Sequence, residues 1–202
     1  MTQKEQILHE SYRLFLKYGI KSLTMEDLSR KSGKSKKTIY KYFRNKEQLV
    51  RSVVEHFVNE QKEVLTRFNK TAANPILEMA SIYQYTANAF SHLKPSIIND
   101  LQKHYPDCWQ KFLEYKEGFL LNSIIENINT GIKQGLYRDD LNVEIVARYY
   151  AFRAEDFRNE NMFPPEKFSF SEVLRSIFCY HIRGLASEKG LEVLKNEVEL
   201  NF

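Results

Sequence analysis

The chain has 202 residues, 43% of them hydrophobic, so it can bury a sizeable core in one or two domains and is not a disordered chain. Its formal charge of +4 is uneven: residues 1–50 hold 12 Lys and Arg against 5 Asp and Glu, and the remainder holds 18 against 21. The difference of +7 against −3 predicts an anionic partner for the amino-terminal part and a different role for the rest.

Cysteine usage and the amino terminus indicate a reduced, cytoplasmic protein. Cys108 and Cys179 are the two cysteines, and neither lies in a CxxC or Cys/His pattern, so the sequence supports no disulfide framework or zinc site. A signal-peptide pattern is missing, and no stretch approaches the roughly 18 apolar residues that span a bilayer. We therefore expect no membrane contact, no metal ion and no cofactor.

Apolar residues recur at helical spacing almost everywhere and hairpin signals are absent, so the sequence predicts an all-α fold. The first predicted helix carries Ile7, Leu8, Leu14 and Phe15 on its apolar side. It is expected to end at Gly19, which can adopt the left-handed conformation without steric strain.

Capping residues divide the next part of the chain. Thr24 and Asp27 predict a capping box at the start of a short second helix, and Gly33 is expected to end that helix. Ser35 can cap a third helix that runs to about residue 44, and Asn45 is expected to open a longer fourth helix.

Prolines mark the later boundaries. Asn74 and Pro75, at the end of the NKTAANP segment, are expected to be the cap and the first residue of the next helix. Pro95 and Pro106 should interrupt later helices. Further helices are expected over residues 108–131, 143 to about 159, and 172 to about 188, the last opened by Ser169 and Glu172. The NMFPPEKFSF segment is expected to be a loop.

Residues 25–43 contain each part of a DNA-reading helix-turn-helix, which needs a small residue at the helix crossing, a left-handed turn and apolar plugs. Ser29 fits the crossing, Gly33 the turn, and Leu28 and Ile39 the plugs. With Ile39 and Phe43 directed inward, the polar side chains of the third predicted helix, which is the second helix of the motif, should point outward.

The amino end of this third predicted helix is expected to approach the bases. Lys36 and Lys37 can donate to guanine O6 and N7, and Thr38 offers a hydroxyl and a methyl group. A good bidentate base contact contributes about 1–3 kcal/mol of discrimination.

Other polar residues of this region are better candidates for phosphate contacts. Tyr40, Tyr42 and Lys46 carry suitable donors, and a cation at the start of the fourth helix opposes that helix's dipole, which an anionic partner would explain. The alternative is that these lysines only solvate a surface. The agreement of crossing residue, turn, plugs, caps and charge distribution favours DNA binding.

Residues 11–50 resemble the DNA-binding domain of TetR-family transcriptional regulators. The family pattern is met at Leu14-Phe15, Gly19, Thr24, residues 33–35, residues 38–43 and residues 46–49. The resemblance implies DNA-contact roles for Thr38, Tyr40, Lys41, Tyr42 and Lys46. With the residues reasoned above, the predicted DNA-binding set is Thr24, Ser35, Lys36, Lys37, Thr38, Tyr40, Lys41, Tyr42 and Lys46.

This sequence departs from the family pattern at two places. Ser29 and Ser32 stand where alanine is frequent, and Lys36-Lys37 replaces a pair that is usually small or contains glycine. A relative's base preference is therefore not expected to transfer to this chain.

The resemblance also implies a bacterial origin and a two-domain organisation, with a helix-turn-helix domain over residues 1–46 and a helical effector-binding and dimerisation domain over residues 47–202. In the family the last two helices form the dimer interface. Helices that are apolar on more than one face fit that role, although ordinary core packing is the alternative. The predicted dimer residues are Tyr149, Phe152, Ile177, Phe178 and His181.

Aromatic residues are frequent between residues 82 and 119, and small-ligand pockets are mostly apolar with a few polar groups. We expect an effector that is small and apolar or aromatic, although each aromatic alone is more often core. Gln84 and His92 are further polar candidates. The predicted effector-binding set is Tyr83, Asn88, Phe90, His104, Trp109, Tyr115 and Phe119.

The sequence thus predicts a homodimeric repressor that a small effector releases from a pseudo-palindromic operator. An alternative is a DNA-bound interaction platform that a protein partner regulates. An enzyme is disfavoured, because the sequence lacks a catalytic Ser/His/Asp arrangement, a phosphate-binding glycine loop and an HExxH motif.

Overall fold

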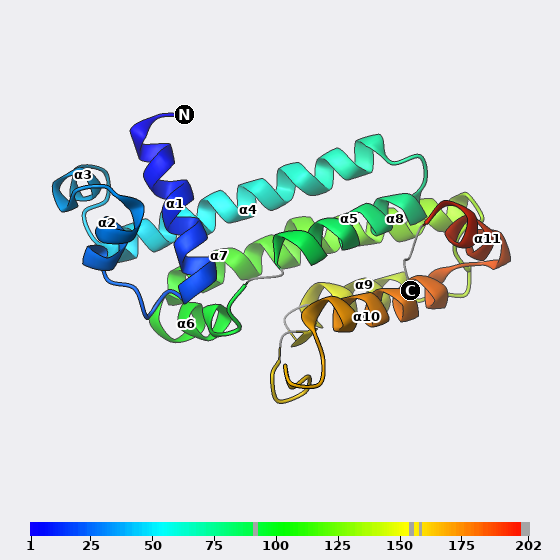
Figure 1. Cartoon of the computed structure of the whole chain (residues 1–202). Coiled ribbons are helices and arrows are strands. Elements are labelled where there is room, and N and C mark those ends of the chain that lie inside the picture. The colour runs from blue at the N-terminus through cyan, green and yellow to red at the C-terminus, as the bar shows by residue number, and fades with distance from the viewer. Residues whose placement is uncertain (91–92, 154–155, 158, 199–202) are drawn as a thin grey trace. The chain divides into compact units, whose positions relative to one another are not determined.

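The computed structural model describes residues 1–90, 93–153, 156–157 and 159–198, and over these residues it is helical without a β-strand (Figure 1). The all-α prediction is confirmed. The chain divides into two compact units. Unit 1 is formed by the described residues of 1–61 and 92–115, and unit 2 by those of 62–91 and 116–202. The boundary expected after residue 46 coincides with the start of α4, whereas the two units divide within that helix.

Unit 1 contains the helix-turn-helix and two helices from the middle of the chain. Its elements are α1 (Gln3–Tyr18), α2 (Met25–Ser32), α3 (Lys36–Tyr42), the first part of α4 (Lys46–Thr71), α6 (Ser96–His104) and α7 (Pro106–Tyr115). The predicted caps are present: Thr24 and Asp27 form a reciprocal capping box, and Ser35 accepts from the Thr38 amide. Gly33 is left-handed, with φ 65°.

The core of unit 1 joins residues that are far apart in the sequence. Leu28 and Ile39 are each at most 1% exposed, which confirms the predicted plugs, and Phe15 of α1 is buried with them at 2%. Ile97 and Leu101 of α6 pack into the same core, four residues apart on one helix face. Burial of this face therefore makes α6 an integral part of unit 1.

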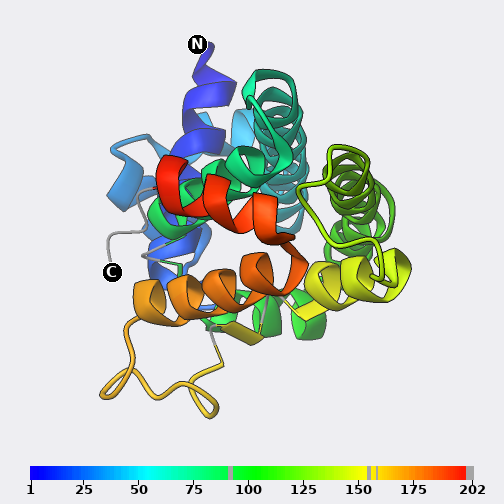
Figure 2. The same cartoon turned by 90° about the vertical axis from the view of Figure 1, so that its right-hand side faces the viewer.

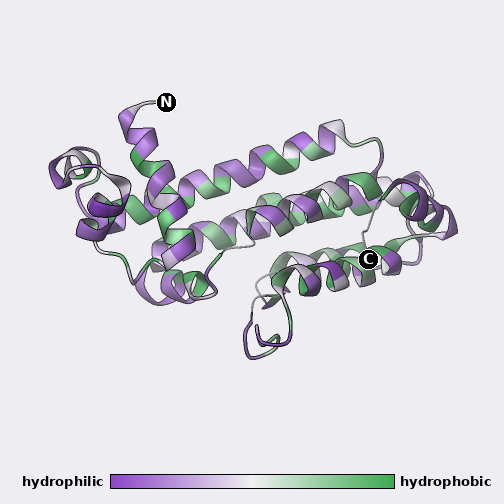
Figure 3. Ribbon diagram, viewed as in Figure 1, coloured by the Kyte–Doolittle hydropathy of each residue, from purple (hydrophilic) through white to green (hydrophobic). Residues whose placement is uncertain are grey.

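Unit 2 is a second helical bundle. Its elements are the end of α4, α5 (Pro75–Ala89), the π-helix η1 (Lys116–Leu120), α8 (Leu121–Lys133), α9 (Val143–Arg153), α10 (Phe170–Leu185) and α11 (Glu188–Glu197). Its core includes Ile76, Ile128, Ala147 and Ile182. In Figure 2, α11 (red) turns back over α10 (orange). Hydrophobic and hydrophilic residues alternate along these helices in Figure 3, as expected for one-sided burial.

Several predicted boundaries need correction. Gly19 ends α1 with φ 85° and ψ 157°, a positive-φ conformation that favours glycine but is not the left-handed helical conformation. The helix expected over 108–131 begins earlier, at Pro106, and contains the π-helical turn. The helix expected from residue 172 begins at Phe170, because its cap Ser169 directly precedes that residue.

The ends of two later segments also differ from the prediction. The helix α9 ends at Arg153, and residues 154–155 and 158 of its expected extension lie outside the described residues. The separate helix α11 was not predicted, although Ser187 caps it by accepting from the Gly190 amide. None of the helices in the described ranges is long and apolar enough to cross a bilayer.

A buried polar chain crosses unit 2. The Asn127 amide, 2% exposed, donates to a Glu78 carboxylate oxygen at 2.8 Å and to the Pro75 carbonyl at 3.1 Å. The Tyr137 hydroxyl donates to Asn127 Oδ1 at 3.1 Å. Burial raises the pKa of Glu78 and outweighs the opposing hydrogen bonds from Asn127 and Asn69. These hydrogen bonds connect α5 to α8, and each of the buried polar side chains in them has a partner.

Candidate DNA-binding surface

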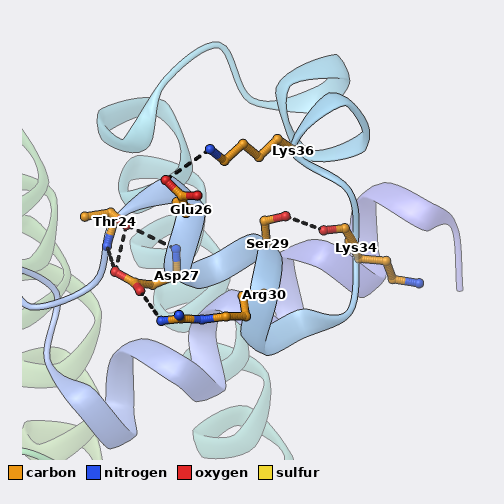
Figure 4. A network of polar contacts seen from close by, with 7 residues as sticks. All are labelled: Thr24, Glu26, Asp27, Ser29, Arg30, Lys34 and Lys36. Carbon is orange, nitrogen blue, oxygen red and sulfur yellow. Dashed lines mark hydrogen bonds and ion pairs between the residues drawn. The ribbon is translucent and has the colours of Figure 1, made fainter.

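The turn between α2 and α3 is closed by hydrogen bonds around the predicted crossing residue (Figure 4). The Ser29 hydroxyl donates to the Lys34 carbonyl at 2.6 Å, and the Lys34 amide donates to the Ser29 carbonyl at 3.2 Å. Gly33 supplies the positive φ that this short connection requires. Ser29 therefore does more than provide a small side chain, because its hydroxyl fixes the turn.

A polar network fixes the beginning of α2 (Figure 4). Asp27 Oδ2 accepts from the Thr24 hydroxyl at 2.7 Å and from the Thr24 amide at 3.1 Å, while Oδ1 accepts from Arg30 at 2.8 Å. The hydrogen bonds from Thr24 lower the pKa of Asp27, with a smaller contribution from Arg30. Thr24, predicted to contact DNA, is thus engaged in capping α2.

Helix α3 presents cations to solvent along its length. Lys36, Lys37 and Lys41 are exposed, and Tyr40 is 49% exposed. Lys36 forms an ion pair with Glu26 of α2, with 3.0 Å between Nζ and Oε2 (Figure 4). Both side chains are solvated, so this pair contributes little to stability, and a phosphate could replace Glu26 as the partner.

Ser35 and Thr38 are joined to each other. Their hydroxyl oxygens lie 2.8 Å apart, and Ser35 Oγ accepts from the Thr38 amide at 3.0 Å. Ser35 is exposed and Thr38 is partly exposed. The pair therefore caps α3 while its hydroxyl groups remain at the surface.

Tyr42 and Lys46 are less exposed than the α3 lysines. The Tyr42 hydroxyl donates to Gln3 Oε1 at 3.0 Å, and Lys41 Nζ lies 5.3 Å from the Tyr42 ring centroid. Burial lowers the pKa of Lys46, and the carboxylates of Asp100 and Asp27 partly oppose that change. Lys46 is therefore partly buried, whereas the lysines of α3 are exposed.

The structure adds residues that the sequence did not indicate for this surface. Gln3 bonds Tyr42, and Gln6 accepts from Lys34 Nζ at 3.4 Å, so the amino end of α1 borders the helix-turn-helix. Glu26 joins through Lys36. The two glutamine contacts span 39 and 28 residues, and no local pattern encodes such pairs.

The residues predicted to bind an effector divide between the two units. His104, Trp109 and Tyr115 belong to unit 1, where Trp109 packs against the core that carries the helix-turn-helix. The other four, Tyr83, Asn88, Phe90 and Phe119, belong to unit 2. His92 lies outside the described residues. The proposed effector-binding role of the set stays a prediction.

The predicted dimer residues differ in exposure. Tyr149 is 56% exposed, and Phe152 and Ile177 are intermediate. Phe178 and His181 are buried within the chain, at 7% and 5% exposed, because that face of α10 is directed into the unit 2 core. Phe178 stacks on Tyr83, with ring centroids 4.7 Å apart. Further exposed apolar side chains on these helices are Ile145 at 65% and Tyr180 at 81%.

Residues 7–53 match the sequence model described as bacterial regulatory proteins, tetR family. An uncharacterized HTH-type transcriptional regulator of Bacillus subtilis, YvaF, is 26% identical, covering 92% of this chain and 96% of the relative. The HTH-type transcriptional repressor KstR2 of Mycolicibacterium smegmatis is 22% identical, with 73% and 74% coverage. A Bacillus subtilis FadR structure in complex with stearoyl-CoA shares the fold, with TM-score 0.66, 19% identity, and 89% and 98% coverage.

The matched domain contains the capped α2, the closed turn and the exposed α3 described above. Residues 7–53 therefore form a DNA-binding domain of the tetR family, and the chain as a whole is similar to HTH-type transcriptional regulators along most of its length.

Proposed function

We propose that the chain is a homodimeric repressor that binds a pseudo-palindromic operator and that a small effector releases from it. The observation that carries DNA contact is the exposed row of Lys36, Lys37 and Lys41 on a rigidly capped α3. Lys36, Lys37 and Thr38 would approach base edges, while Tyr40, Tyr42 and Lys46 would contact phosphates. Thr24 and Ser35 cap their helices at the same surface.

Salt dependence tests the electrostatic part of this proposal. Affinity for a labelled random-sequence duplex should fall as salt rises, with a logarithmic slope of about −0.9 per neutralised phosphate. If the surface contacts several phosphates, the logarithmic slope should have a magnitude of several units. A slope near zero, or no binding at low salt, would contradict a DNA-binding role for this surface.

The proposed dimer uses the exposed faces of α9 and α10. Ile145 and Tyr149 lie four residues apart on one face of α9, and Tyr180 projects from α10 at 81% exposure. Large exposed apolar side chains of this kind are typical of interfaces, where aromatic residues are enriched. A second copy of the chain would cover them.

Oligomeric mass tests the dimer. Tyr149→Glu combined with Tyr180→Glu should shift light-scattering mass from dimer to monomer, because two carboxylates would be placed in the apolar contact. Leu191→Glu, at an exposed apolar position of α11, is the matched control and should leave the mass unchanged. A monomeric wild-type chain, or a double variant that remains dimeric, would contradict this interface.

The effector part rests on the aromatic content of unit 2. Tyr83, which is partly buried, stacks on buried Phe178, and a FadR of similar fold was solved in complex with stearoyl-CoA. An effector can release DNA only as far as its affinities for the two states differ. A compound that lowers operator affinity should lose that effect in Tyr83→Ala, whereas an unchanged response would place the effector elsewhere.

The alternative of an interaction platform is favoured by one observation. Met162 and Phe168, between α9 and α10, are 56% and 45% exposed. A protein partner could cover them. If Met162→Glu with Phe168→Glu abolishes regulation while effector binding and dimer mass are retained, this second function gains support over the first.

A further inference from the structure

A buried carboxylate connects α6 to the helix-turn-helix. Asp100 is 8% exposed, and its Oδ2 accepts from the Lys21 amide at 2.8 Å. Lys21 lies in the link between α1 and α2, 79 residues away in the sequence. The DNA-contact residues assigned above do not include Asp100, so its burial and its long-range contact call for a separate explanation.

The link between α1 and α2 lies closely against α6 at this point. A Cβ atom added to Gly19 would lie 3.0 Å from Ser96 Oγ and 3.6 Å from Asp100 Oδ2. The Lys94 amide also donates to the Leu16 carbonyl at 3.0 Å, just before α6 begins. One backbone–backbone hydrogen bond, one hydrogen bond from a backbone amide to the Asp100 carboxylate, and a close approach therefore fix the end of α1 and the following link.

We propose that Asp100 is a positioning residue for DNA binding, which fixes the link between α1 and α2. The inference rests on the proposed DNA-binding surface and adds a residue that does not itself contact DNA. Misplacing the link would tilt α2 and α3 together, because the Ser29 hydroxyl joins α2 to the turn before α3.

The sign of the charge effect makes this inference testable. Removing a carboxylate makes the chain more positive, and general electrostatics then favours tighter binding to DNA. Loss of a positioning residue predicts weaker binding. Asp107 is the matched control, because it is an exposed carboxylate of the same unit that pairs with Arg51 at 3.2 Å.

The experiment measures affinity of the full chain for a duplex recovered by selection from a random library, across a salt series. Asp100→Ala should weaken binding about tenfold, and Asp100→Asn about threefold, since asparagine keeps an oxygen acceptor for the Lys21 amide but has no charge. Asp107→Asn should bind as tightly as wild type or slightly more tightly. Circular dichroism establishes that each variant is folded.

If folded Asp100→Asn and Asp100→Ala bind as tightly as wild type, Asp100 has no positioning role. If Asp100→Ala does not fold, Asp100→Asn alone decides the question. Failure of the proposed function is distinguishable, because the wild-type chain would then show no salt-dependent binding in the same series.

Discussion

Unit 1 and unit 2 differ in how their important contacts are encoded. In unit 1, most contacts that shape the helix-turn-helix join residues three to five apart, such as Thr24 with Asp27 and Ser29 with Lys34. In unit 2, Asn127 connects to Glu78 across 49 residues and to Pro75 across 52. Helix caps and turns built from local contacts can be deduced from one sequence, whereas polar contacts between distant residues cannot.

The largest expected effect concerns the core of unit 2. A Cβ atom on residue 131 would lie 2.1 Å from the Tyr137 ring, which is 2% exposed and fixed through its hydroxyl. Gly131→Ala should therefore lower the free energy of unfolding by about 3 kcal/mol. Gly184→Ala, with open space around residue 184 in α10, is the control and should be neutral or slightly stabilising in thermal melts.

If Gly131→Ala unfolds like wild type, the Tyr137 ring can move without loss. The hydrogen bond of Tyr137 to Asn127 would then constrain the core of unit 2 less than its length of 3.1 Å indicates.

The next prediction addresses the local surface of unit 1. Lys37→Ala should weaken operator affinity about tenfold without changing the thermal midpoint, since Lys37 is exposed. A phosphate role would also reduce the magnitude of the salt slope by about 0.9, and a base role would instead change the preferred sequence. Lys133→Ala, at an exposed position of α8, is the control, and equal losses in both variants would indicate general charge only.

Acid sensitivity should originate in unit 2. Burial lowers the pKa of His181 to about 3, from an ordinary value of 6.5. Its contribution to stability is therefore complete above the unfolded pKa and is lost as pH falls toward the folded value. Between pH 7.5 and 5.5 this loss amounts to about 1.4 kcal/mol.

His181→Leu should flatten the acid part of the stability curve, as measured by urea unfolding. His104→Gln changes an exposed histidine of α6 and should retain the wild-type curve in that range. An unaltered pH dependence in His181→Leu would show that the imidazole is not buried in solution as described.

The smallest expected effect tests the cap of α2. Thr24→Ala should lower stability by about 1 kcal/mol, because the Asp27 amide and carboxylate lose their partner hydroxyl. Thr24→Ser keeps that hydroxyl and should unfold nearly as wild type does in the same urea titration. Equal destabilisation of both variants would assign the effect to the threonine methyl group.

The comparison also explains which predictions succeeded. The caps at Thr24, Ser35 and Asn74 were predictable because side-chain oxygen and amide lie three residues apart on one helix. The contact of Asp100 with Lys21 was not predictable, since nothing local distinguishes Asp100 from a solvated carboxylate.

For the carboxyl-terminal helices, the amino-acid composition did not indicate which side chains are buried and which are exposed. An aromatic-rich helix such as α10 has several apolar faces, and the sequence did not indicate that Phe178 would turn inward while Tyr180 faces solvent. The division of the predicted effector residues between two units has the same origin, because pairing of distant helices decides which aromatic side chains meet.

The central claim is that two copies of the chain present α3 to successive major grooves. Selection of bound duplexes from a random library tests it most directly. The account predicts an enriched pseudo-palindrome whose half-site centres lie about 34–36 Å apart, or a multiple of that repeat, bound by a dimer. Binding without any enriched sequence, or enrichment of a single half-site bound by a monomer, would contradict it.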